Sequence, residues 1–431
     1  MVKVNIVTMG CSKNLVDSEK LAAQLVANGY DVVFDSEDAD AEIAFVNTCG
    51  FINDAKEESI NAILKLAGEK GNSKLKKIVV FGCLSARYYD DLKAELPEVD
   101  FMCGNYNIDE LLAFLGKKSK KELVHSRVAS SGGHYAYLKI SEGCVRNCAF
   151  CAIPLFKGKY VSRPMYDIVA EAEQLAKNGV KELILIAQDL CFYGYDMESR
   201  FMLPELVERL SEIEGIEWIR LHYLYPFLFP ERLLDVIRDN PKVCKYIDIP
   251  LQHISDKVLE GMHRGGNKRQ TIELLDKIRA TVPEAVIRTT MLVGFPCEGD
   301  AEFDELVDFV REQKFDRLGV FTYSEEEGTA AASEFNDVVP QDVKDARAEK
   351  IMEIQQEISL QSNVAKIGRT FRVLIDYVDG EYFVGRTQYD SVEVDNEVLF
   401  PYSDSYNVGD FVDVKVEDAS EYELYGSVVE S

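Results

Sequence analysis

Several residue types and sequence features are scarce in this chain, and each shortage narrows the kind of protein that it can be. Tryptophan occurs once and histidine five times, and the histidines follow no pattern. The longest apolar runs, such as IVVFG and LILIA, have the length of strands, far short of the roughly 18 residues of a membrane helix. The N-terminus, MVKVNIVTMGC, lacks the charged head, apolar middle and small-residue cleavage site of a secretory signal. We therefore expect no membrane association and a cytoplasmic location.

Basic residues are also scarce, with 48 Lys and Arg against 75 Asp and Glu, which gives a net charge of −27 over 431 residues. So acidic a protein repels phosphate backbones at long range and attracts basic partners. In a reducing compartment its ten cysteines are predicted to bind metal or take part in chemistry rather than to form disulfides. The length exceeds one ordinary core, which predicts two or three domains.

The first part of the chain, residues 1–116, alternates strands with helices, which predicts a parallel α/β sheet. The expected strands lie at 2–8, 42–48 and 77–82, and the expected helices at 15–28, 53–67 and 86–96. Residues 117–134 are polar, locally basic and contain glycine, which predicts a linker.

A second strand–helix series occupies residues 135–364 and predicts an open (β/α)6 barrel, short of the eight units of a closed one. Its strands are expected at 136–141, 182–188, 217–224, 246–252, 285–295 and 317–324, and a polar helix follows at 341–364. Residues 365–431 show only short alternating strands between turn residues, which predicts a small antiparallel, OB-like β-barrel.

Three cysteines, Cys144, Cys148 and Cys151, lie in EGCVRNCAFC after the first strand of the predicted barrel. Three thiolates can hold three irons of a four-iron, four-sulfur cluster and leave the fourth iron open to a small molecule. A structural zinc would need a fourth Cys or His, which Ala149, Phe150 and their neighbours do not supply. The spacing, with an aromatic residue before the last cysteine, resembles the radical S-adenosylmethionine (SAM) signature. In that family SAM chelates the open iron and is split by one electron into methionine and a 5′-deoxyadenosyl radical.

Three further cysteines are far apart in the sequence, yet each lies just past an expected strand: Cys11 in TMGC, Cys49 in NTCG and Cys83 in VFGC. The carboxyl ends of parallel strands share one edge of a sheet, so these cysteines are expected to converge on a second cluster. Taken singly, each could be an ordinary buried cysteine. Cys103, Cys191, Cys244 and Cys297 lack such placement and are predicted to be structural.

Both triplets together resemble the methylthiotransferase family, and the match covers nearly the whole chain. Within that family the chain looks most like the branch that modifies an aspartate of small-subunit ribosomal protein S-twelve. The stretches that carry this resemblance are VNTCGFI (46–52), GCLSARY (82–88), YLKISEGC (137–144), YIDIPLQH (246–253), RTTMLVGFP (288–296) and FDRLGVFTYSEEEGT (315–329). The family architecture implies an N-terminal cluster domain, a radical-SAM barrel and a C-terminal TRAM domain.

The resemblance also implies two four-iron clusters, SAM and an electron donor such as flavodoxin or ferredoxin. The cluster on Cys144, Cys148 and Cys151 would generate the radical that removes a hydrogen from the aspartate β-carbon. The cluster on Cys11, Cys49 and Cys83 would supply a sulfur species that a second SAM has methylated. The products would be methylthio-aspartate, methionine, 5′-deoxyadenosine and S-adenosylhomocysteine.

Five other residues are implied near the cofactor by the same resemblance. Glu182 matches the region that contacts the SAM amino group, Phe150 lies within the cluster loop, and Gln188, Gln252 and Arg288 lie at later strand ends where SAM and substrate are held. Capping and barrel ion pairs are the alternative roles for the polar four. The sequence departs from the family at Cys297, where glycine is usual after VGFP, and at Leu190–Phe192, which replaces a small polar pair.

The charge of the last segment bears on the substrate. Between residues 366 and 431, five basic residues stand against fifteen Asp and Glu, a net charge of −10. Such a domain is a poor partner for RNA and suits a basic ribosomal protein, whose encounter it would steer. A tRNA adenosine methylthiotransferase and a two-cluster electron-transfer protein are the alternative hypotheses, and tRNA is the less expected partner.

Overall fold

The computed structural model describes residues 1–37, 40–130 and 132–429. Its contacts divide the chain into two compact units. Unit 1 comprises residues 1–130, 137–146 and 152–174, and unit 2 comprises 131–136, 147–151 and 175–431. Ser131, within the predicted linker, and the last two residues of the predicted barrel lie outside the described residues.

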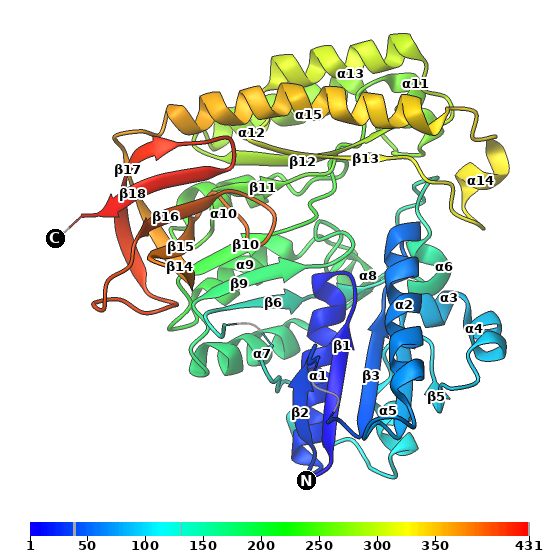
Figure 1. Cartoon of the computed structure of the whole chain (residues 1–431). Helices are drawn as coiled ribbons and strands as arrows, with labels where there is room; N and C mark the ends of the chain where they lie inside the picture. Colours follow the sequence, from blue (N-terminus) through cyan, green and yellow to red (C-terminus); the bar gives the residue numbers. More distant parts are fainter. Residues whose placement is uncertain (38–39, 131, 430–431) are drawn as a thin grey trace. The chain divides into compact units, whose positions relative to one another are not determined.

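Unit 1 is built on a five-stranded parallel sheet with strand order β2-β1-β3-β4-β5. Figure 1 shows β1, β2 and β3 of this sheet in blue and the edge strand β5 in cyan. Its elements are β1 (Lys3–Thr8), α1 (Ser12–Ala27), β2 (Asp31–Phe34), β3 (Ile43–Thr48), α2 (Asn53–Glu69), β4 (Lys77–Gly82), α3 (Cys83–Arg87), α4 (Tyr89–Glu95), β5 (Phe101–Met102), α5 (Ile108–Phe114) and the 3-10 helix η1 (Lys121–Leu123).

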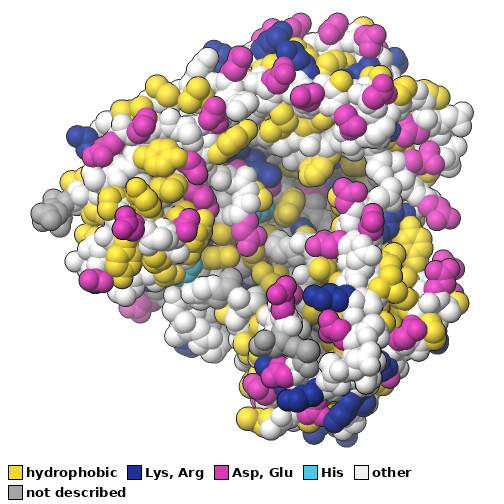
Figure 2. All heavy atoms as spheres, in the orientation of Figure 1, with side chains coloured by type: hydrophobic (Ala, Val, Ile, Leu, Met, Phe, Trp, Pro, Cys, Tyr) yellow, Lys and Arg dark blue, Asp and Glu magenta, His cyan; other side chains and the backbone are white. Residues whose placement is uncertain are grey.

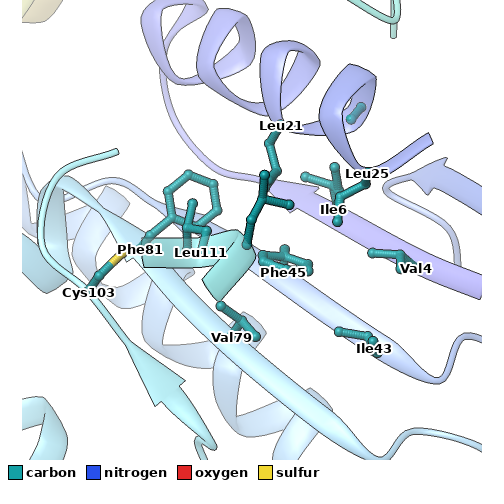
Figure 3. Close-up of a cluster of buried hydrophobic side chains, with 12 residues drawn as sticks. Val4, Ile6, Leu21, Leu25, Ile43, Phe45, Val79, Phe81, Cys103 and Leu111 are labelled. Atoms are coloured by element: carbon teal, nitrogen blue, oxygen red, sulfur yellow. The ribbon is translucent and has the colours of Figure 1, made fainter. Parts of the chain in front are cut away.

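The two faces of this sheet are covered by different helices because alternate strand residues point to opposite sides. On one face Ile6, Phe45 and Phe81 pack against Leu21 of α1 and Leu111 of α5, as Figure 3 shows. On the other face buried residues of β3 and β4 pack against α2, α3 and α4; they are Ala44, Val46, Ile78 and Val80. The strands are apolar on both faces, as expected for a sheet covered on both sides.

Unit 1 also contains a later part of the chain: β7 (Ser141–Glu142), α6 (Ile153–Lys157), β8 (Val161–Ser162) and most of α7 (Met165–Lys177). Phe156 of α6 packs beside Cys83 of α3. Glu171 of α7 is fully buried and forms ion pairs with Lys20 of α1 at 2.9 Å and with Arg163 at 2.6 Å. The contacts of Phe156 with Cys83 and of Glu171 with Lys20 thus join this later part of the chain to the first helices of unit 1.

Unit 2 contains the barrel series, in two three-stranded sheets of order β10-β9-β6 and β11-β12-β13. The chain passes from one unit to the other within β6. The elements of this series are β6 (Tyr135–Lys139), β9 (Glu182–Ile186), α8 (Tyr195–Glu198), α9 (Leu203–Ser211), β10 (Trp218–Leu221), α10 (Arg232–Asp239), β11 (Tyr246–Asp248), α11 (Asp256–Gly261), α12 (Lys268–Thr281), β12 (Val286–Val293), α13 (Asp300–Gln313), β13 (Arg317–Thr322), α14 (Ala330–Glu334) and α15 (Gln341–Val364).

A closed barrel of order β14-β15-β16-β18-β17 ends unit 2. Its strands, red and orange in Figure 1, are β14 (Thr370–Asp379), β15 (Tyr382–Thr387), β16 (Glu397–Pro401), β17 (Phe411–Ala419) and β18 (Glu423–Val428). Four of its strand pairs are antiparallel, whereas β16 and β18 run parallel. The predicted antiparallel pattern therefore fails at this one pair, which closes the barrel.

The loop between β15 and β16 contacts the amino-terminal ends of the larger barrel's strands. Asp390 pairs with Arg317, the first residue of β13, and Asp395 accepts from Tyr246, the first residue of β11, at 2.6 Å. Arg220 of β10 donates to the carbonyl oxygen of Gln388 at 2.9 Å. This end of the larger barrel is thus filled by buried, paired polar groups.

The predicted fold class is confirmed: a parallel α/β sheet, six barrel strands and a small closed β-barrel. The sequence missed β2 and β5, which are short strands at the two edges of the sheet. It also merged α3 and α4, which are separated at Tyr88. No described helix combines the length and apolar character that crossing a membrane requires.

Candidate metal centres

Cys11, Cys49 and Cys83 all lie at the carboxyl edge of the unit 1 sheet. Cys11 is the N-cap residue of α1, Cys49 directly follows β3, and Cys83 begins α3 directly after β4. The register places Thr8 opposite Asn47 and Thr48 opposite Gly82, so the three strands end at the same level. The three cysteines thus follow strand ends at one edge of the sheet, and their role as ligands of one cluster stays a prediction.

One side chain, that of Asn14, contacts all three cysteine loops. Its amide nitrogen donates to the carbonyl oxygen of Met9 at 2.9 Å and to that of Thr48 at 3.1 Å. Its oxygen lies 3.8 Å from Cys83 Sγ, as the acceptor of a thiol hydrogen bond. Asn14 is fully buried, and Asn47 holds its backbone through a 2.8 Å bond to the carbonyl oxygen. Asn14 was not among the residues predicted from the sequence, although its place one turn into the helix after Cys11 was a usable signal.

Two glycines permit the close approach of these loops. A Cβ on Gly10 would lie 2.5 Å from Cys49 Cβ and 2.6 Å from its Sγ, and Gly10 has a φ of +84°, in the region that favours glycine. A Cβ on Gly50 would lie 2.7 Å from the Cα of Leu84, the residue after Cys83. Larger side chains at either position would push the cysteines apart.

The three thiols differ in exposure, and burial raises the pKa of two of them. Cys11 is exposed, while Cys49 and Cys83 are buried. Burial raises the pKa of the Cys49 thiol, and it raises that of Cys83 to about 12 although the nearby Lys157 ammonium opposes the rise. A buried thiol with so high a pKa stays protonated unless a cation compensates its charge, and a bound iron would do this.

The second triplet lies in the loop after β7, and the chain crosses between the units within it. Cys144 belongs to unit 1, where its backbone N–H donates to the carbonyl oxygen of Gly158 at 3.3 Å. The backbone N–H of Arg146 donates to Cys144 Sγ at 3.3 Å. Cys148 and Cys151 belong to unit 2 and are joined by a 3.0 Å backbone hydrogen bond.

Unit 2 holds the segment around Cys148 and Cys151 with several contacts. Ala149 donates its N–H to the carbonyl oxygen of Met262 at 2.9 Å and accepts from Ala331 N–H at 2.8 Å. Phe150 packs against a buried apolar cluster that includes Phe295 and Tyr323. The guanidinium of Arg264 donates to Cys148 Sγ at 3.2 Å. No sequence pattern pointed to Arg264.

Two of the predicted SAM-contact residues, Gln188 and Gln252, lie at carboxyl ends of barrel strands. Gln188 follows β9, and its buried Oε1 has no hydrogen-bond partner within the described chain. Gln252, after β11, has a φ of +74°, and its backbone bonds to Thr290 and Leu292 of β12. Non-glycine residues with positive φ are costly and gather at functional sites.

Glu182 and Arg288 occupy a different place from the one that the sequence interpretation gave them. Glu182 is the first residue of β9, at its amino end, and is fully buried in ion pairs with Arg220 and Arg386. Arg288, the third of the eight residues of β12, pairs with Asp248 at 3.0 Å and with Asp395 at 3.5 Å. Active sites of such barrels lie at the carboxyl ends of the strands, so these two residues do not fit SAM contact. Their alternative role, as barrel ion pairs, fits the geometry.

The remaining cysteines lie among apolar side chains. Cys103 packs in the core that covers one face of the unit 1 sheet, and Cys244 packs beside Trp218 and Tyr246. Cys191 is fully buried, and Cys297 packs against the cluster around Phe295. Among the residues that the structure describes, no three His, Cys, Asp or Glu side chains stand close enough to share a single metal ion. A four-iron cluster does not require this, because each thiolate binds a different iron.

Comparison with known proteins gives a consistent identification. The model of the uncharacterized protein family UPF0004 matches residues 3–104, the Radical SAM superfamily model matches 138–310, and the TRAM domain model matches 367–429. A protein of Bacteroides fragilis named ribosomal protein uS12 methylthiotransferase RimO is 52% identical over 427 residues, 99% of each chain. The protein of that name from Flavobacterium johnsoniae is 51% identical over 426 residues, which are 98% of this chain and 97% of the relative.

The chain belongs to the RimO family of radical-SAM methylthiotransferases. The resemblance inferred from the sequence is thereby confirmed. Family membership brings SAM and iron–sulfur chemistry, because the radical-SAM superfamily is defined by both.

Solved structures share the fold at low sequence identity. The radical SAM methyltransferase TsrM from Kitasatospora setae, solved with cobalamin and a [4Fe-4S] cluster, has a TM-score of 0.58 at 15% identity and covers 77% of both chains. The cobalamin-dependent radical enzyme OxsB has a TM-score of 0.53 at 12% identity over 82% of this chain and 56% of that one. At such identities only the fold is shared.

Proposed function

We propose that this chain inserts a methylthio group at the β-carbon of an aspartate in ribosomal protein S-twelve, with two four-iron clusters. The observation that carries the proposal is the meeting of the Cys11, Cys49 and Cys83 loops at one sheet edge, tied together by Asn14. Reductive cleavage of SAM needs only one cluster, so a second thiolate triplet indicates a further role. A cluster at this edge of the sheet would provide the sulfur species that methylthio insertion requires.

Cys144, Cys148 and Cys151 are the proposed ligands of the cluster that binds SAM. Three donors leave one iron open, and the half-buried loop keeps the sulfurs reachable. When bound, a cluster of this kind supplies the single electron that cleaves SAM reductively. The chain's own part is to fix the loop through Ala149 and to exclude water with the apolar side chains around Phe150.

Cys11, Cys49 and Cys83 are the proposed ligands of the second cluster. The buried pair, Cys49 and Cys83, would exchange thiol protons for iron on assembly. Lys157 places a positive charge near Cys83. Glu142 forms an ion pair with this lysine at 3.2 Å and compensates its charge. The donor set fits an iron–sulfur cluster, since soft thiolate ligands favour such clusters.

SAM is proposed to lie at the carboxyl ends of the unit 2 strands, against Phe150, Gln188 and Gln252. The unpartnered Oε1 of Gln188 is the observation that favours this, because a buried polar atom without a partner costs free energy that a ligand donor would recover. Glu182 and Arg288 are not part of the proposed site.

The acidic small barrel supports a basic protein substrate over tRNA. Two of its five basic residues are already engaged: Arg386 is buried against Glu182 and Asp376, and Arg372 pairs with Glu217 at 3.0 Å. Figure 2 shows acidic side chains spread over the visible face among fewer lysines and arginines. An RNA backbone would find few free cations on this barrel.

The domains are proposed to run over 1–116, 135–364 and 365–431, with a linker between the first two. The three family matches fall inside these ranges. We propose flavodoxin or ferredoxin as electron donor and the cytoplasm, where ribosomes are made, as location.

The test compares three candidate substrates in separate incubations. Anaerobically reconstituted full-length enzyme, with SAM and a reductant, is incubated with S-twelve, with S-twelve whose target aspartate is alanine, and with tRNA. A mass gain of one methylthio group on wild-type S-twelve alone is expected. A gain on tRNA adenosine and none on S-twelve would overturn the substrate proposal. Absence of 5′-deoxyadenosine would instead indicate a two-cluster electron-transfer protein.

A further inference from the structure

The guanidinium of Arg264 is directed at the sulfur of Cys148. Its Nη1 lies 3.2 Å from Cys148 Sγ, well inside hydrogen-bond range for sulfur, and the residue is only 3% exposed. Arg264 Nη2 donates to the carbonyl oxygen of Pro250 at 2.5 Å. Hydrogen bonds from charged donors are roughly twice as strong as neutral ones.

This buried cation has no carboxylate partner, unlike the other buried arginines of unit 2. Arg220 pairs with Glu182, Arg317 with Asp390, and Arg347 with Glu298. Within the described part of the chain, no Asp or Glu oxygen lies within 4 Å of the Arg264 guanidinium, and its Nε has no hydrogen-bond partner. Asp189 attracts it only at longer range. An uncompensated buried charge is strongly destabilising, so a compensating negative charge is expected at Cys148.

The backbone holds Arg264 in this position. α11 ends in a Schellman motif, in which His263 at φ +55° donates to the Glu260 carbonyl oxygen at 2.9 Å and Arg264 N–H donates to that of Leu259 at 3.0 Å. The Tyr225 hydroxyl donates to the Arg264 carbonyl oxygen. The ring of the same tyrosine lies 4.5 Å from the guanidinium carbon, a cation–π contact.

We propose that Arg264 is a positioning residue that sets the reduction potential of the cluster held by Cys144, Cys148 and Cys151. The inference rests on the proposed function, since it requires that cluster. Reduction adds one electron, from the flavodoxin- or ferredoxin-like donor, and no bond or proton is exchanged because the guanidinium stays protonated. A fixed positive charge at hydrogen-bond distance from a ligand sulfur stabilises the reduced state more than the oxidised state. Arg264 thus makes the cluster easier to reduce.

The experiment isolates this one cluster in the full-length chain. In a background where Cys11, Cys49 and Cys83 are alanine, the reconstituted cluster is titrated potentiometrically and followed by electron paramagnetic resonance without SAM. At the midpoint potential of the background protein, Arg264→Gln is expected to lower the ratio of reduced to oxidised cluster about tenfold, which is a shift of about 59 mV for a one-electron couple. Arg264→Lys keeps the charge and is expected to shift the midpoint less, in the same direction.

Tyr225→Phe is the matched control, since it removes only the hydroxyl bond and keeps both the Schellman turn that holds the Arg264 backbone and the ring against the guanidinium. Its midpoint is expected to equal that of the background. A lowered melting temperature of Arg264→Gln with an unchanged midpoint would show a purely structural residue and overturn the proposal. If Arg264→Gln holds no iron, Arg264→Lys decides by the same criterion: a negative shift supports the proposal and an unchanged midpoint overturns it. A background protein without iron would instead defeat the proposed function.

Discussion

Asn14 donates its side-chain amide to the carbonyl oxygen of Thr48 at 3.1 Å, and thereby joins the helix after one candidate ligand to the strand before another. Thr48 directly precedes Cys49, and Asn14 lies three residues beyond Cys11. The spacing of the two loops therefore depends on a buried residue that need not touch iron.

Asn14→Ala is expected to impair assembly of the cluster on Cys11, Cys49 and Cys83 alone. The change leaves the carbonyl oxygens of Met9 and Thr48 without this donor, at a cost of about 1–3 kcal/mol each for a buried group. Iron analysis after anaerobic reconstitution should show a fall from about eight irons toward about four per chain. Asn28→Ala, at the other end of α1, is the control and should keep all the iron; full iron in Asn14→Ala would contradict the expectation.

The two triplets are expected to fail separately. Cys83→Ala should leave about four irons and continued formation of 5′-deoxyadenosine from SAM, but no methylthio product; Cys144→Ala should leave about four irons and abolish both. Cys103→Ala, a buried cysteine in the core of the same sheet, is the matched control. Loss of 5′-deoxyadenosine in Cys83→Ala would show that the two sites do not act independently.

Gln188→Leu is expected to weaken SAM binding with little effect on stability. The Oε1 of Gln188 has no partner within the described chain, so its loss breaks no hydrogen bond of that atom, whereas one lost ligand bond of about 0.5–1.5 kcal/mol weakens binding up to about tenfold. Equilibrium SAM binding and thermal unfolding measure the two effects. A dissociation constant equal to that of the wild type would remove Gln188 from the site.

Glu182→Gln is expected to lower the stability of the fold with little effect on SAM binding, because Glu182 neutralises two buried guanidinium groups. Removing this partner from Arg220 and Arg386 should cost about 3–5 kcal/mol of the free energy of unfolding, as measured by urea denaturation. Glu212→Gln breaks an exposed ion pair with Arg209 and should cost less than about 1 kcal/mol. Reduced SAM affinity in folded Glu182→Gln, with stability unchanged, would restore the interpretation of Glu182 as a SAM contact.

Glu171 predicts an acid-dependent loss of stability. Although burial opposes it, attraction by Lys20, Arg163 and Arg127 lowers the pKa of Glu171 from an ordinary 4.5 to about 2. The unfolded chain therefore binds this proton first, so the stabilisation is complete above about pH 4.5 and is lost as pH falls toward 2. Burial lowers the pKa of Lys20 to about 8, so it stays charged throughout this window. Between pH 5 and 2, the free energy of unfolding should depend less on pH in Glu171→Gln than in the wild type. In the control Glu173→Gln, on the same helix, its pH dependence should equal that of the wild type.

The sequence by itself determined the fold class and the two cysteine triplets. Strand periodicity located the strands that precede Cys11, Cys49 and Cys83, and parallel pairing then required their ends to meet, because the register of such a sheet aligns carboxyl ends at one edge. The short spacing of Cys144, Cys148 and Cys151 was local, so it could be recognised without tertiary structure. The long matching stretches, such as VNTCGFI (46–52), made the resemblance to the methylthiotransferase family specific.

Only the tertiary structure decided which polar residues are partners. Glu182 and Arg220 are 38 residues apart, and Arg386 comes from a different barrel, so no local pattern could show that they neutralise one another. Arg264 follows a short helix 116 residues after Cys148, and its direction depends on the Schellman turn and on the aromatic ring at position 225. Ion pairing and burial are set by long-range packing, whereas helices, strands and ligand spacing are set by neighbours along the chain.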